Sequence, residues 1–259
     1  MTRALLIAAA ALSAAPALAQ DGGADVRALL ERPRAEPPQS VNYRYVLDVE
    51  ARHAEGEDAD TTARASIAVD ATAAPGSRTS VLSRDDATKD LTKIIDGVIE
   101  GIEDKDNTPA RMSESFYCTL DAEGFSVARE DAVHAVLVPD AASMEAVMRK
   151  DGTPKRIARR LAERLDGEIV LSKPDLGITS TAFRLTEPMK VMMVAKIHDM
   201  ELTQSCVPSP DGFNRSETMG MRTRVTAMGK DTRTAMTMRV RDVVPVVAGA
   251  GAAGAPGGR

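Results

Sequence analysis

The sequence has few of the residues, and none of the common short motifs, by which many enzymes are identified. Its 259 residues include no tryptophan, four phenylalanines and three histidines. It has no phosphate-binding P-loop, no Gly-x-Ser-x-Gly nucleophile motif and no His-Glu-x-x-His zinc motif, which excludes the enzyme classes that these motifs define. His53, His134 and His198 each stand alone, without a second histidine two or four positions away. We therefore predict no metal site, no cofactor and no catalytic residue.

Neither sign of charge is in large excess. The chain has 33 basic and 38 acidic residues, which gives a formal net charge of −5. Because nucleic-acid-binding domains are usually strongly basic, we expect no nucleic-acid partner. The apolar stretch at residues 4–15 is also shorter than the roughly 20 residues that a membrane-spanning helix needs. We expect no transmembrane segment.

The apolar stretch is instead typical of a secretory signal peptide. Arg3 precedes it, and Ala17 and Ala19 place small residues at positions −3 and −1 of a cleavage site between Ala19 and Gln20. We predict that residues 1–19 are removed. Because the residue directly after the cleavage site is Gln20 and not cysteine, we predict that no lipid is attached. The mature protein is expected to be soluble and either periplasmic or secreted.

Cys118 and Cys206 are the only cysteines. In an oxidising compartment two distant cysteines are expected to form one structural disulfide. A redox-active role is disfavoured because the Cys-x-x-Cys spacing is absent.

Hydrophobic periodicity predicts a single α+β domain over residues 41–242. Residues 20–40 predict a short helix and a proline-rich lead-in, and the Gly/Ala/Pro-rich residues 243–259 predict a disordered tail. Alternating apolar residues predict strands, the clearest at residues 41–52 and 62–71. The remaining expected strands lie at 78–83, 125–128, 133–138, 168–171, 182–185 and 189–203, with a further alternation at Phe116, Cys118 and Leu120.

Helical periodicity is clearest just after residue 85, where Leu91, Ile95 and Ile102 belong to the apolar stripe of an amphipathic helix of about eighteen residues. Two further helices are predicted at 141–149 and 154–165. Strands and helices are segregated along the chain and do not alternate regularly. This order predicts a large, curved antiparallel sheet with three or four helices packed on one side.

The last two strands are predicted to form a hairpin, at residues 219–227 and 232–240. A type II′ turn at Gly229-Lys230 pairs Met221 with Met238, and Met219 with Val240. One face then carries four methionines: Met219, Met221, Met236 and Met238. The opposite face carries five arginines: Arg222, Arg224, Arg233, Arg239 and Arg241. Apolar and basic residues separate under one register, which supports the hairpin.

The methionine face has three interpretations and the arginine face has two. The methionines pack the core, since methionine fills irregular gaps, or they line a cavity for a lipid or another apolar ligand; paired thioethers also suit Cu(I). The arginines contact an anionic partner, such as phospholipid head groups or an acidic envelope component, or they form an ordinary solvated face.

The order of elements over residues 41–242, after an export signal, resembles that of the periplasmic lipoprotein-carrier (LolA/LolB-like) half-barrels. The resemblance implies an antiparallel sheet that wraps around helices and holds acyl chains. The stretch from Cys206 to Gly212, Cys-Val-Pro-Ser-Pro-Asp-Gly, also resembles one in exported bacterial proteins that have no assigned activity, and it implies none here.

Three functions remain open. The first is a non-enzymatic envelope protein that binds or carries an apolar or amphiphilic ligand. The second is an interaction or assembly factor whose arginine-rich face contacts an acidic partner. The third is a hydrolase with a dispersed active site.

Overall fold

The computed structural model describes residues 38, 40–85, 88–118, 124–150, 153–174, 177–192 and 195–246. The predicted signal peptide with its cleavage site at Ala19 and Gln20 lies outside the described residues. The predicted helix within 20–40 and the tail beyond residue 246 lie outside them as well.

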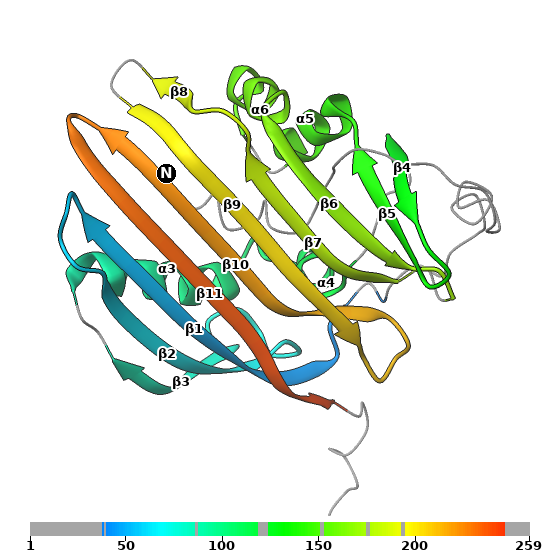
Figure 1. The fold of residues 1–259 in the computed structure, drawn as a ribbon. Helices are drawn as coiled ribbons and strands as arrows, with labels where there is room; N and C mark the ends of the chain where they lie inside the picture. The colour runs from blue at the N-terminus through cyan, green and yellow to red at the C-terminus, as the bar shows by residue number, and fades with distance from the viewer. Residues whose placement is uncertain are drawn as a thin grey trace, which may run out of the picture.

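The described residues form one open, antiparallel, eleven-stranded sheet (Figure 1). Its order is β3-β2-β1-β11-β10-β9-β7-β6-β5-β4, and β8 pairs with β9 beside this path. The first strands are β1 (Tyr43–Glu55), β2 (Thr61–Asp70), β3 (Thr79–Asp85), β4 (Phe125–Glu130), β5 (His134–Pro139) and β6 (Leu165–Ser172). They are followed by β7 (Ile178–Leu185), β8 (Met189–Met192), β9 (Ala195–Pro208), β10 (Asn214–Ala227) and β11 (Lys230–Pro245). The predicted α+β class with a large antiparallel sheet is confirmed.

Four helices are described: α3 (Lys89–Glu103), α4 (Pro109–Phe116), α5 (Ala141–Lys150) and α6 (Lys155–Ala162). Among the described residues, no helix combines the length and the apolar character that crossing a membrane requires. All four helices lie behind the sheet in the view of Figure 1.

Helix α3 forms where the 3.6-residue periodicity predicted a helix. The Thr88 side chain accepts a hydrogen bond from the Leu91 N–H and caps its first turn. Leu91, Ile95 and Val98 are buried on one side of the helix. At its C-terminal end the buried Arg78 donates to the Ile102 carbonyl, at 3.1 Å. A cation is favourable there, because the last carbonyls of a helix carry partial negative charge.

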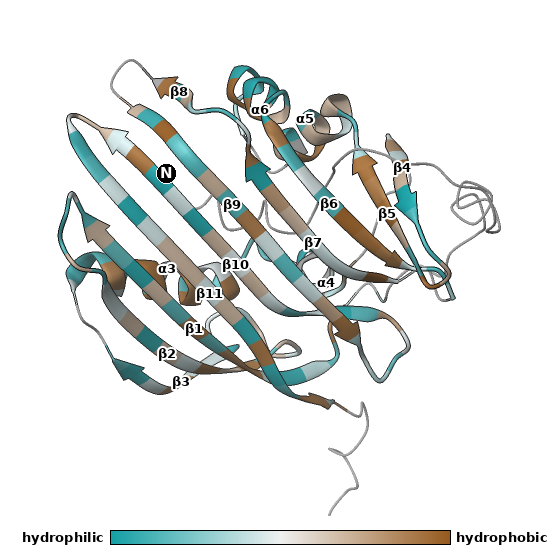
Figure 2. Ribbon diagram, in the orientation of Figure 1, coloured by the Kyte–Doolittle hydropathy of each residue, from teal (hydrophilic) through white to brown (hydrophobic). Residues whose placement is uncertain are grey.

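The two faces of the sheet differ in composition, because successive side chains of a strand point to opposite faces. Figure 2 shows the resulting alternation of hydrophilic and hydrophobic residues along the strands. The inner face, which the helices cover, carries buried residues such as Val49 of β1, Leu202 of β9 and Ile169 of β6. The outer face carries charged and small polar residues, such as Glu50, Thr203 and Arg239.

Three apolar clusters fill the inner face. The α3 cluster comprises α3, α4, β1, β2 and β11. The α5–α6 cluster joins those two helices to residues of β6, β7 and β9, including Phe183 and Leu202. The disulfide cluster surrounds Cys118 and Cys206 with residues of β5, β6 and β7.

Three sequence predictions require correction. The alternation at Phe116, Cys118 and Leu120 predicted a strand, but Phe116 is the last residue of α4, which begins at Pro109 with Thr108 as its cap, and Leu120 lies outside the described residues. Residues 189–203 form two strands, β8 and β9. Strand β11 continues to Pro245, so the first three residues of the predicted tail belong to the sheet, where Tyr43 pairs with Pro245.

The register of the β10–β11 hairpin differs from the prediction by two residues. Met219 pairs with Met238, and Met221 with Met236. Met228 and Gly229 form the two-residue turn, and both have positive φ, 52° and 81°, which defines a type I′ turn and not the predicted type II′. Because the shift is even, every side chain keeps its predicted face.

Candidate ligand-binding face

The four predicted methionines form a strip across β10 and β11 on the inner face. We call Met219, Met221, Met236 and Met238 the methionine strip. Met236 and Met238 are only 3% and 7% exposed and belong to the α3 cluster. Met219 and Met221, directly opposite them, are half-buried. The β11 half of the strip therefore packs the core, while the β10 half retains accessible apolar surface.

Met221 lies at a boundary between apolar clusters. It packs against the α3 cluster and also against the α5–α6 cluster. Met219 packs against the α3 cluster alone. Thioether side chains adapt readily to irregular neighbours. The middle of the inner face is thus lined by flexible apolar groups.

Three polar side chains are buried beside the strip. We call Thr181, Gln204 and Ser216 the polar trio; they are 3%, 4% and 1% exposed. Thr181 of β7 lies opposite Gln204 of β9, which lies opposite Met219. Ser216 of β10 lies opposite Cys206, two residues from Gln204. The trio therefore occupies the place where the three apolar clusters meet.

Two hydroxyls of the polar trio have no hydrogen-bond partner among the residues that the structure describes: Thr181 Oγ1 and Ser216 Oγ, both buried. An unsatisfied buried polar group costs about 1–3 kcal/mol, and most buried polar side-chain atoms in proteins do have a partner. Thr181 and Ser216 are therefore exceptions that the packing of the described residues does not explain.

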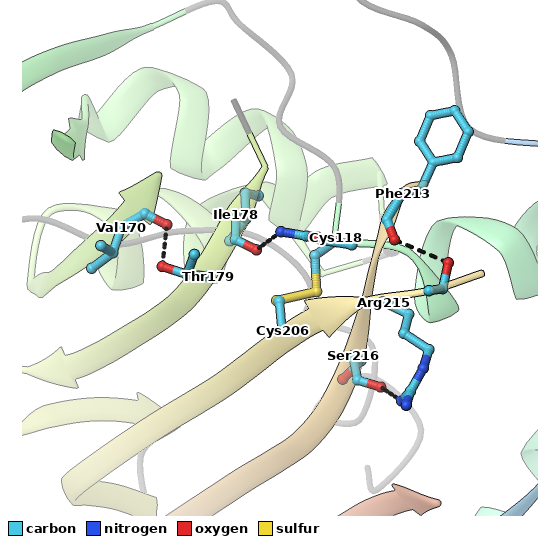
Figure 3. The surroundings of a disulfide bond; sticks show 10 residues. Cys118, Val170, Ile178, Thr179, Cys206, Phe213, Arg215 and Ser216 are labelled. Carbon is cyan, nitrogen blue, oxygen red and sulfur yellow. Dashed lines mark hydrogen bonds between the residues drawn. A yellow bond between two sulfur atoms is a disulfide. The ribbon is translucent and has the colours of Figure 1, made fainter. Parts of the chain in front are cut away.

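The predicted disulfide is confirmed. Cys118 and Cys206 are bonded, with their Cα atoms 6.3 Å apart. The bond ties the segment after α4 to the end of β9, beside Ser216 (Figure 3). The disulfide thereby fixes the position of Cys206, the residue opposite Ser216.

Near the disulfide, strand β10 pairs with β9 on one side, and on its other side the partner changes from β11 to Tyr117. A bulge interrupts its pairing with β9 between Ser216 and Thr218, and Tyr117 bridges to Arg215. Arg215 Nη1 donates to the Ser216 carbonyl at 3.2 Å (Figure 3). Its buried Nε has no partner, and desolvation lowers the pKa of this guanidinium. Bulges commonly re-aim side chains next to functional sites.

The stretch from Cys206 to Gly212 has a structural role in the β9–β10 turn. The Asp211 carboxylate accepts hydrogen bonds from the hydroxyls of Tyr117 and Ser209 and from the Phe213 N–H. Burial acts to raise the pKa of Asp211, but hydrogen bonds from Ser209, Tyr117 and Tyr43 outweigh it and lower this pKa below its usual value. The turn is thus anchored to β1 and to the end of α4.

The five predicted arginines all lie on the outer face, most of them beside carboxylates. Arg241 contacts Asp48 at 2.6 Å, and this hydrogen bond is the main cause of the lowered pKa of Asp48. Arg241 also pairs with Asp242, and further ion pairs are Arg224–Asp231 at 2.7 Å, Arg222–Glu201 at 3.5 Å and Arg233–Asp60 at 4.0 Å. Arg239 lies opposite Asp48 on β1. Carboxylates of the same sheet thus offset most of this positive charge.

One group of outer-face residues has the composition of a hydrolase triad. The His198 ring lies 2.9 Å from Thr226 Oγ1, which lies 3.5 Å from Asp231 Oδ1. A catalytic triad needs the imidazole between hydroxyl and carboxylate, whereas here the hydroxyl is in the middle. Among the described residues, no group of three His, Cys, Asp or Glu side chains is arranged to hold a metal ion.

Comparison of the chain with known proteins finds no matching family model, no matching curated protein and no matching solved structure.

The residue pattern predicts the methionine strip but not the polar trio. A signal was present: Gln204 occupies an apolar position of its strand, between Leu202 and Cys206, and Thr181 precedes Phe183 by two. That these residues are neighbours depends on the pairing of β7, β9 and β10, which the sequence does not reveal.

Proposed function

We propose that the protein is an exported, non-enzymatic binding protein that holds an apolar or amphiphilic ligand on the inner face of its sheet. In this proposal the sheet and helices act as a half-barrel-like container, as in the periplasmic lipoprotein carriers that the element order resembles. The disulfide supports export, because such bonds persist mainly in oxidising compartments.

The observation that carries the proposal is the half-buried β10 side of the methionine strip. Met219 and Met221 lie between residues that are almost fully covered, yet both keep accessible surface. Ligand sites are mostly apolar with a few placed polar groups, and methionine-rich surfaces adapt to varied apolar ligands. A flexible apolar lining suits an acyl chain better than a rigid aromatic ligand.

The alternative, an acidic partner on the outer face, is less well supported. Such a partner would compete with Asp48, Glu201 and Asp231 for the arginines. The hydrolase alternative lacks an imidazole in the position that a triad requires.

Fluorescence titration with an apolar probe tests the proposal. We expect N-phenylnaphthylamine to bind the mature chain saturably. Met219→Gln with Met221→Gln keeps side-chain length but adds two amides, and we expect at least a 10-fold loss of affinity, because burying an unpaired amide is unfavourable. Thr237→Gln, on the exposed outer face of β11, is the matched control and should bind like the wild type. The proposal fails if the wild type shows no saturable binding or if the folded double variant binds equally well.

A further inference from the structure

We propose that the polar trio is the head-group subsite of this ligand, and that the ligand is an amphiphile with an uncharged, hydrogen-bond-accepting head such as an ester or amide carbonyl. The inference rests on the proposed function. It goes beyond it by naming the chemistry of the ligand head and the residues that bind it.

Position is the first argument. The polar trio lies where the three apolar clusters meet, and Gln204 is directly opposite Met219. Directly opposed side chains in an antiparallel pair have Cβ atoms about 4.5–5.5 Å apart. A head group at the polar trio would therefore place its acyl chain along Met219 and then Met221, on the same face of β10.

Hydrogen-bonding capacity is the second argument. Thr181 Oγ1 and Ser216 Oγ are both buried and unpaired, and Gln204, 4% exposed, carries an amide with two donor hydrogens. All three side chains can donate as well as accept, and a carbonyl oxygen, which has two lone pairs, can accept from both unpaired hydroxyls. A ligand that accepts these bonds removes a cost that the unliganded fold otherwise carries.

The absence of charged side chains among the polar trio and its inner-face neighbours favours an uncharged head group. Thr181, Gln204 and Ser216 are uncharged, and their inner-face neighbours Ile169, Leu202 and Cys206 are apolar. Burying a carboxylate here without a cation would be strongly unfavourable. Arg215, the residue before Ser216, donates to the Ser216 backbone carbonyl (Figure 3). An uncharged ester or amide is therefore favoured over a free fatty acid.

Displacement of bound N-phenylnaphthylamine by three ligands tests this inference: 1-monooleoylglycerol, oleate and 1-octadecene. We expect monooleoylglycerol to compete about 10-fold more strongly than the other two. Thr181→Val combined with Ser216→Ala should remove that advantage, a loss of about 10-fold for two hydrogen bonds. The variant should still bind octadecene and the probe like the wild type. Thr203→Val with Ser205→Ala, the same changes on the outer face of β9, is the matched control.

Folding of the variant is checked independently. Deleting unpaired hydroxyls should leave the midpoint of thermal unfolding of the unliganded protein unchanged or raise it. A midpoint well below that of the control would mean that the hydroxyls are structural, and it would overturn the inference. So would equal loss in the control, an unchanged monooleoylglycerol affinity, or a preference for oleate that Arg215→Gln abolishes. If the wild type binds no probe at all, the proposed function itself fails.

Discussion

The outer and inner faces of the sheet treat polar side chains in opposite ways. On the outer face charged residues form ion pairs across neighbouring strands, as Arg64 and Arg44 do with Glu50 and Asp70. On the inner face, polar residues are few, and two of them, Thr181 and Ser216, are buried without a partner. The outer face has many polar side chains, and those named here are paired. The inner face has few polar side chains, and two of them have no hydrogen-bond partner among the described residues.

This difference is the reason that we place the proposed ligand on the inner face. Exposed ion pairs contribute little, because each charge is also well solvated. A buried hydroxyl without a partner costs about 1–3 kcal/mol, and a ligand that pairs with it would remove that cost. The arginine-rich outer face is the more conspicuous feature of the sequence. The inner face, however, contains the two hydroxyls whose burial without a partner costs free energy.

The largest expected effect is on the inner face, at the disulfide. Replacing Cys118 and Cys206 with alanine opens a loop with a sequence separation of 88 residues, so we expect a loss of about 4 kcal/mol in the free energy of unfolding. Urea denaturation of the variant, compared with the wild type with and without reductant, measures it. A loss below about 1 kcal/mol would mean that the inner face does not depend on the bond.

The next effect compares the two halves of the methionine strip. Met236→Ala should lower the free energy of unfolding by about 3 kcal/mol, since the side chain is buried in the α3 cluster. Met221→Ala, at the position opposite, should lower the free energy of unfolding by about 1 kcal/mol, because the Met221 side chain is only half-buried. Denaturant unfolding of both variants gives the comparison. Equal losses would mean that Met221 is an ordinary core residue and would weaken the proposed ligand face.

The third effect is at the β9–β10 turn. Asp211→Asn should cost about 1–2 kcal/mol, because the carboxylate accepts from two hydroxyls and an N–H. The folded-state pKa of Asp211 lies below its unfolded value, so its stabilisation is present above about pH 4 and is lost as the pH falls through the folded pKa. Thermal unfolding between pH 2 and pH 6 should show a shallower acid decline in the variant. Parallel curves for the two proteins would exclude Asp211 as a source of that decline.

Burial and the hydrogen bond to Asp211 raise the pKa of Tyr117 above its usual value of 10.0. Its stabilising contribution is therefore present below about pH 10 and is lost as the pH rises through the folded pKa. Thermal unfolding measured from pH 7 to above pH 10 should show a shallower alkaline decline in Tyr117→Phe than in the wild type, and parallel curves would exclude Tyr117 as a source of that decline. Control measurements at pH 7 separate this effect from the simple loss of one hydrogen bond.

The sequence predicted those features that depend on local periodicity or on residue counts. Alternation along β1 and β2, the apolar stripe of α3 and the two-cysteine disulfide belong to this group. The faces of β10 and β11 were correct although their register was wrong, because an even shift preserves faces. A type I′ turn places a positive φ on Met228, whereas such positions usually hold Asn, Asp or Gly; this is why the turn was misplaced.

The features that were not predicted depend on long-range neighbours. Helix α4 was not predicted, and the alternation of Phe116 and Cys118 placed its last residue in a strand, although Thr108-Pro109 carries a capping signal. The carboxylates beside the arginines come from β1 and β9 as well as from the hairpin. Likewise the polar trio comes from three strands, and no single segment of the sequence contains more than one of its members.

The smallest expected effect is on the outer face and provides the sharpest test of the comparison between the two faces. Arg222→Gln, Arg224→Gln and Arg239→Gln together should change the thermal midpoint by about 1 °C, because these side chains are exposed and their ion pairs are well solvated. Probe binding should be unchanged, since the three side chains point away from the methionine strip. Binding to phosphatidylglycerol vesicles is measured in parallel at low and high salt. If the wild type binds these vesicles and the triple variant does not, the outer face has a binding role that its ion pairs do not suppress, and the contrast between the two faces no longer holds.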